Sequence, residues 1–99
     1  MNTLLDQQLP GDVMRDIAER MVRRRKEKGL TQVRLAEKSG VSLGSLRRFE
    51  ASHQISLASL VKISFALGCE DDFAALFAKR GYASIEEVVR EGRGGTPRR

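Results

Sequence analysis

Two adjacent arginines, Arg47 and Arg48, carry the clearest chemistry in this 99-residue chain. A guanidinium group is a planar fork of N–H donors, which can donate two hydrogen bonds to O6 and N7 of guanine or can bind a phosphate. Small polar side chains precede the pair at Ser42 and Ser45. The alternative interpretation is a helix face that is only solvated. The surrounding elements are needed to choose between these interpretations.

The stretch from Gln32 to Phe49 has the spacing of two short helices joined by a tight turn. Ala36 provides a small side chain where two steeply crossing helices meet, and Gly40 can adopt positive φ without a Cβ clash. Leu46 and Phe49 stand three residues apart and share the inner face of the second helix. Such a unit places the outer face of its second helix in the major groove of DNA. The spacing therefore predicts a sequence-specific DNA-binding protein.

Composition argues against other classes of function. The length and the 40% of apolar side chains suit one small domain. The single cysteine, Cys69, allows no intramolecular disulfide and favours a reducing compartment, which we take to be the cytoplasm. One Cys and one His cannot complete a typical metal cage, and no phosphate loop or nucleophile–base pair indicates an enzyme. We expect no cofactor, no metal, no catalytic residue and no membrane-spanning segment.

Positive charge is concentrated in the first two thirds of the chain. The formal net charge is +5, of which residues 1–30 contribute +2, residues 31–68 contribute +3 and residues 69–99 contribute zero. A basic surface gains affinity for phosphate by releasing counterions, but it carries no sequence information. A soluble surface that happens to be basic would have the same composition.

Apolar periodicity predicts helices almost throughout and no strand, so the predicted class is all-α. The first helix is expected from Asp12, its N-cap, to Lys28, with Val13 and Met14 in its buried stripe. Further helices are expected at 32–38, from 43 to about 50 and from Ser56 to Leu67 with Leu57 buried, and a fifth begins near 71. A sixth follows a capping box at Ser84 and Glu87.

These helices suggest four segments: an N-terminal segment at 1–11, a DNA-binding domain at 12–68, a helical extension at 69–91 and a disordered basic tail at 92–99. The extension is a candidate dimer or partner interface. Its aromatic residues, Phe73, Phe77 and Tyr82, are expected to lie in the core rather than in an interface.

The chain resembles the phage repressor/Cro-type, or Xre-type, helix-turn-helix family. The resemblance covers about half of the chain, from Ile17 to Gly68, and rests on RRRKEKGLTQVRLAEKSGVSLGSLRRFE followed by ISLASLVKISFALG. It implies a five-helix bundle of the lambda-repressor type, a bacterial or phage origin, and a repressor that binds a palindromic operator on double-stranded DNA as a homodimer.

A narrower resemblance implies an additional partner. The SGVSLGSLRRFE core, the ISLASL segment and FAALFAKRGYASIEEVVREGR are similar to small regulators encoded beside HipA-type kinase toxins. The chain would then be an antitoxin that represses its operon and binds a kinase-type toxin through its C-terminal region. A neighbouring kinase gene would separate this hypothesis from a repressor with no protein partner but its own copy.

The family resemblance also assigns roles to single residues. Gln32 matches the residue that holds a DNA phosphate, the alternative being a solvated surface glutamine. Ser45 and Arg34 are further phosphate candidates. His53 is either a phosphate donor or a surface loop residue. Arg25 and Glu50 match a buried salt bridge, which is architectural because an unpaired charge there would be costly.

Base readout is expected from the outer face of the second helix of the motif, at Ser42, Leu43, Gly44, Arg47 and Arg48. Arg48 matches a base-reading position of the family, whereas Arg47 can take either a base or the backbone. Leu43 and Gly44 depart from family members that carry polar side chains there. Leucine can only touch a thymine methyl and glycine has no side chain, so more of the specificity should come from DNA shape or from the close backbone approach that Gly44 permits.

Overall fold

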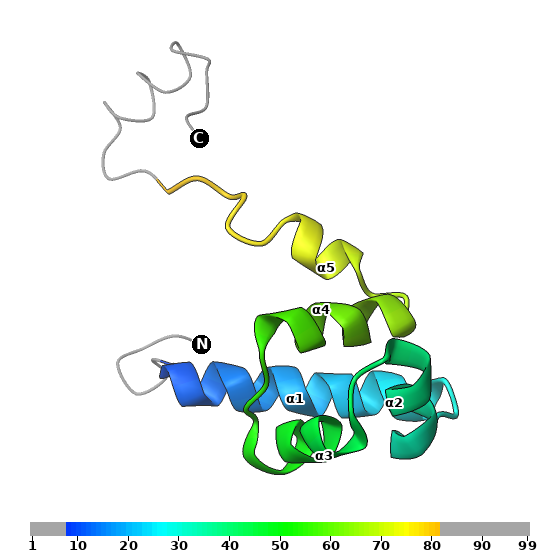
Figure 1. The fold of residues 1–99 in the computed structure, drawn as a ribbon. Helices are drawn as coiled ribbons and strands as arrows, with labels where there is room; N and C mark the ends of the chain where they lie inside the picture. The colour runs from blue at the N-terminus through cyan, green and yellow to red at the C-terminus, as the bar shows by residue number, and fades with distance from the viewer. Residues whose placement is uncertain (1–7, 82–99) are drawn as a thin grey trace, which may run out of the picture.

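The computed structural model describes residues 8–81, and all of its regular elements are helices. They are α1 (Pro10–Glu27), α2 (Gln32–Ser39), α3 (Leu43–Ser52), α4 (Leu57–Ala66) and the short α5 (Asp71–Ala74). No strand occurs in that part of the chain, which confirms the all-α class. Helices α1 to α4 form a bundle, and the segment containing α5 leads away from it on the side of α4 (Figure 1). The expected sixth helix and basic tail, like the first seven residues, lie outside the described residues.

Hydroxyl side chains start three of the helices, as the sequence predicts. Thr31 accepts from the amide of Arg34, Ser42 from that of Ser45, and Ser56 from that of Ser59, each at 3.1 Å. Each bond satisfies one of the free amides at a helix start. Gly40 then ends α2 with φ at 76°, the left-handed conformation that the turn into α3 requires.

The first helix begins two residues earlier than expected. Pro10 takes its first position, and Asp12 lies inside the first turn, where Oδ2 accepts from the amide of Leu9 at 3.0 Å. The prediction that Asp12 is the N-cap is therefore wrong, because its carboxylate reaches back over the turn. Arg15 pairs with Asp12 and Asp16, and the hydrogen bond and negative charge of Asp16 raise the pKa of the Arg15 guanidinium.

The core lies where α2 contacts α3 and α4 and where α1 contacts α3. Leu35 and Leu46 are fully enclosed and Phe49 nearly so. The remaining buried apolar residues are Ala18, Met21, Ala36, Val41, Ile63 and Leu67. Ala36, Leu46 and Phe49 therefore have the positions expected of a helix-turn-helix. The core fixes the inner face of α3 and leaves its other side to solvent.

Three residues that were expected in the buried stripes are exposed. Val13 and Met14 are 40% and 42% exposed because the first turns of α1 extend beyond α3 and α4 (Figure 1). Leu57 is 65% exposed at the first position of α4. The predictions that these residues are buried are wrong, since no helix of the described chain covers them.

The expected core role of the aromatic residues after α4 is also wrong for Phe77. Helix α5 ends at Ala74, and Phe77 is 94% exposed with φ at 64°. Leu76 is 53% exposed, and Phe73 is half-buried. The segment has no bundle surface beside it, so its apolar side chains face solvent. Tyr82 lies outside the described residues.

Substitutions at two positions of α2 test this core. We expect Leu35→Ala to lower the free energy of unfolding by about 2–5 kcal/mol, because it leaves a cavity at a fully enclosed site. Val33→Ala, at a site that is 45% exposed, should change it by less than about 0.5 kcal/mol. Urea denaturation at one protein concentration measures both. Equal losses would show that Leu35 is not in the core.

Candidate nucleic-acid interface

Helix α3 has a small-residue midline on its outer face, with an arginine on each side. Leu46 and Phe49 point into the core, at 0% and 2% exposure. At about 100° per residue, the direction opposite to them passes between Gly44 and Ala51. Arg47 lies to one side of this line and Arg48 to the other, and all four residues are exposed. The outer face of α3 therefore has only small residues along its middle and one arginine on each side.

The fold does not require glycine at position 44. A Cβ there would meet no atom within 4 Å, and its φ lies outside the left-handed region. The empty space in front of Gly44 is thus available to something that approaches α3 closely. Ala51 was not among the residues predicted on this face, because the helix was expected to end near Glu50, whereas α3 continues to Ser52. The signal was a small residue seven positions, or two turns, after Gly44.

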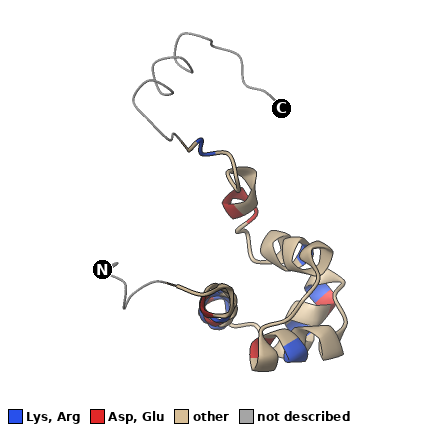
Figure 2. Cartoon of the chain, turned by 90° about the vertical axis from the view of Figure 1, so that its left-hand side faces the viewer, with Lys and Arg blue, Asp and Glu red and all other residues tan. Residues whose placement is uncertain are grey.

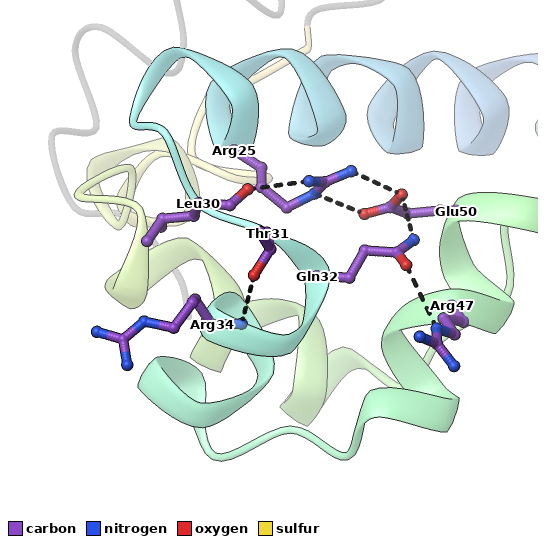
Figure 3. A network of polar contacts seen from close by, with 7 residues as sticks. All are labelled: Arg25, Leu30, Thr31, Gln32, Arg34, Arg47 and Glu50. Atoms are coloured by element: carbon purple, nitrogen blue, oxygen red, sulfur yellow. Dashed lines mark hydrogen bonds and ion pairs between the residues drawn. The ribbon is translucent and has the colours of Figure 1, made fainter.

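A bidentate ion pair anchors α3 to α1. Arg25 donates from Nε to Oε2 of Glu50 at 2.9 Å and from Nη2 to Oε1 at 3.1 Å (Figure 3). The two side chains are only 10% and 13% exposed. Arg25 also donates from Nη1 to the carbonyl oxygen of Leu30 at 3.0 Å, in the turn before α2. One guanidinium therefore connects α1, the turn that follows it and α3.

Gln32 extends this network to the outer face of α3. Its Nε2 donates to Oε1 of Glu50 at 2.8 Å, and its Oε1 accepts from Nε of Arg47 at 3.3 Å (Figure 3). Gln32 is half-buried rather than freely solvated. Arg47 consequently leans toward the start of α2.

Arg48 turns the opposite way, toward the loop after α3. Its Nη2 donates to Oε1 of Gln54 at 2.9 Å. The two side chains line a shallow cleft together with Ser45, Ile55, Ser56 and Ser59. Gln54 reaches Arg48 because His53 ends α3 in the left-handed conformation, with φ at 66°. His53 is half-buried, and its backbone amide donates to the carbonyl oxygen of Phe49 at 2.8 Å.

The other candidate residues differ in how free their side chains are. The hydroxyl of Ser42 is engaged in the cap of α3 and also donates to Oγ of Ser45 at 2.9 Å. Leu43 is half-buried and packs against the core. Arg34 is exposed on α2 and pairs with Glu37 at 3.3 Å. Ser45 is exposed at the edge of the cleft near Arg48.

A scan against protein-family models matches residues 22–73 to the family described as helix-turn-helix. The chain belongs to this family. It is a regulator of transcription that binds double-stranded DNA, and its family is regulatory rather than enzymatic. Searches of the curated proteins and of the solved structures each returned no match. In the described part of this helix-turn-helix protein, no helix is both long and apolar enough to cross a bilayer.

The acidic first turn of α5 in this helix-turn-helix protein lies away from α3. Asp71 and Asp72 occupy the first turn of α5, on the far side of α4 from α3 in both views (Figures 1 and 2). Glu50, the acidic residue of α3 itself, is paired with Arg25. Neither the carboxylates of α5 nor Glu50 therefore cancels the positive charge of the two exposed arginines of α3, and this charge suits the phosphates of DNA.

The ion pair can be tested against an exposed pair one residue away. We expect Arg25→Ala to lower the free energy of unfolding by about 3 kcal/mol, because Glu50 would be left in a mostly buried place without its cation. Arg24→Ala breaks a pair with Glu27 whose side chains are 47% and 60% exposed. It should cost less than about 1 kcal/mol. If the two variants melt alike, the Arg25–Glu50 pair does not anchor α3.

Proposed function

We propose that this regulator is a repressor that binds a palindromic operator as a homodimer, with Arg48 reading a guanine in each half-site. The observation that carries the proposal is the pair of exposed arginines on either side of the Gly44–Ala51 line. A low midline lets α3 approach the floor of the major groove, and a guanidinium at its edge can then reach O6 and N7 of guanine.

Backbone contacts in this proposal come from residues that surround α3. Gln32, Arg34 and Ser45 bind phosphate, and the half-buried His53 contributes only through the turn that it forms. Ser42 and Leu43 lie at the edge of the groove, but the cap and the core already occupy their side chains. Direct readout is therefore narrow, and the deformability of the operator supplies part of the specificity.

Exposed apolar side chains away from α3 support the homodimer. Leu57 and Phe65 are 65% and 64% exposed at the two ends of α4, and Val61 lies between them at helical spacing on the same side. Leu76 and Phe77 add exposed apolar surface beyond α5. One recognition helix covers only a few base pairs, so a second copy adds a second half-site.

A second candidate function is that of an antitoxin, which binds a kinase-type toxin through the C-terminal region as well as the operator. The exposed Leu76 and Phe77 favour a protein partner of some kind. A kinase gene beside this one, with co-purification of its product, would support the antitoxin. Absence of binding to that product would leave the repressor.

Binding to operator and to random DNA tests the role of Arg48. We expect Arg48→Ala to reduce the preference for the DNA upstream of its own gene, over a random duplex of equal length, by about 1–3 kcal/mol. Lys62→Ala removes the same charge from α4 and should keep the preference. Fluorescence anisotropy at fixed salt measures both affinities. Equal weakening on the two duplexes by Arg48→Ala would contradict base readout.

Oligomeric state tests the apolar surface of α4. We expect the wild-type chain of 11.0 kDa to sediment as a dimer, and Phe65→Glu to shift it toward monomer with unchanged helical circular dichroism. A buried carboxylate would be desolvated in the interface, which opposes association. Val33→Glu places the same charge at an exposed site of α2 and should leave the dimer intact. A monomeric wild type, or a Phe65→Glu variant that remains dimeric, would contradict this interface.

A further inference from the structure

Gln32 is held in one orientation by its two neighbours. Its amide nitrogen faces a carboxylate oxygen of Glu50, which only accepts hydrogen bonds, and its amide oxygen faces Nε of Arg47, which only donates. The reversed amide would set oxygen against oxygen and N–H against N–H. The second N–H of the Gln32 amide therefore has no partner in these two bonds, and it can donate to a ligand from a side chain whose orientation is fixed.

Arg47 keeps its terminal nitrogens available for another acceptor. Only Nε is used by Gln32, so Nη1 and Nη2 retain their N–H groups. Within residues 8–81, no carboxylate lies within ion-pair distance of Arg47, and the side chain is exposed. The charges of Arg25 and Glu50 cancel beside it, which leaves one net positive charge in this cluster. The cluster thus offers unused N–H donors on two hydrogen-bonded side chains, together with one net positive charge.

We propose that Arg47 and Gln32 together bind one phosphate of the DNA backbone and that Arg47 does not read a base. We call this two-residue phosphate site the clamp. Gln32 starts α2, the helix that crosses the backbone in this kind of unit, and Arg47 leans from α3 toward it (Figure 3). Arg48, held on the opposite side by Gln54, stays beside the groove. This inference rests on the proposed placement of α3 in the major groove.

The two residues act as one unit, because each orients the other. Loss of Arg47 frees the amide oxygen of Gln32, and loss of Gln32 frees Nε of Arg47. Either change removes part of the same site. Glu50 is a positioning residue here, since it accepts from Nε2 of Gln32 and so leaves the amide oxygen to face Arg47.

Salt-dependent binding separates the clamp from base readout. The variants are Arg47→Met, Gln32→Leu, their double variant and Arg48→Met, each compared with the wild type on the upstream DNA and on a random duplex of equal length. A phosphate contact weakens binding to both duplexes by the same factor and lowers the slope of log K against log [salt] by about 1. We expect this of Arg47→Met. The affinity of the double variant should fall by less than the product of the two single-variant factors, because either single change already removes part of the phosphate site.

Several outcomes would overturn the clamp. The first is an Arg47→Met variant that loses its preference for the upstream DNA, and the second is a salt slope for this variant equal to that of the wild type. The third is a double variant whose loss of affinity equals the product of the two single-variant losses. Thermal melting checks that each variant is folded.

The proposed base readout fails by a different result. If the wild type shows no preference for the upstream DNA, or if Arg48→Met keeps that preference, the assignment of Arg48 is wrong. The salt slope on the random duplex still tests Arg47 and Gln32 in either case, because a phosphate contact needs no particular sequence.

Discussion

The ion pair between Arg25 and Glu50 is the contact on which the position of the recognition helix depends. All three guanidinium nitrogens of Arg25 have partners, two on Glu50 and one on the carbonyl oxygen of Leu30. The apolar core holds α3 against the bundle, but apolar contacts are not directional. The bidentate pair adds direction, because its hydrogen bonds are made at only one rotation and one height of α3 relative to α1.

Local signals in the sequence were sufficient for most of the fold. Hydroxyl caps at Thr31, Ser42 and Ser56 and the left-handed turn at Gly40 act within a few residues, so their types alone define the helix starts and the turn. Periodicity was less reliable at the ends of the bundle. It indicates which face of a helix is apolar, but it does not indicate whether another helix lies there. Val13 and Phe77 are exposed for that reason.

In the candidate site, too, the sequence predicted local features but not the contacts between separate segments. The sequence identified α3, its two arginines and the acidic partner of Arg25, because these follow from helical spacing and from family resemblance. The directions of the two arginines did not follow, since each is set by a glutamine from another segment: Gln32 for Arg47 and Gln54 for Arg48. Helical spacing alone places Arg47 and Arg48 on either side of the outer midline of α3, but it does not show which segment each side chain contacts. The two glutamines determine those contacts.

This divergence limits how the regulator can achieve specificity. In the proposed arrangement Arg47 binds the DNA backbone and Arg48 alone is left to read a base, and one bidentate contact discriminates by only about 1–3 kcal/mol. A regulator must select its operator among a large excess of other sites, for which that is too little. The proposed homodimer adds a second half-site, and DNA shape supplies further discrimination in this arrangement. In the proposed dimer the second copy binds the apolar side of α4, whose exposed Leu57 and Phe65 are not among the residues that line the cleft beside Arg48.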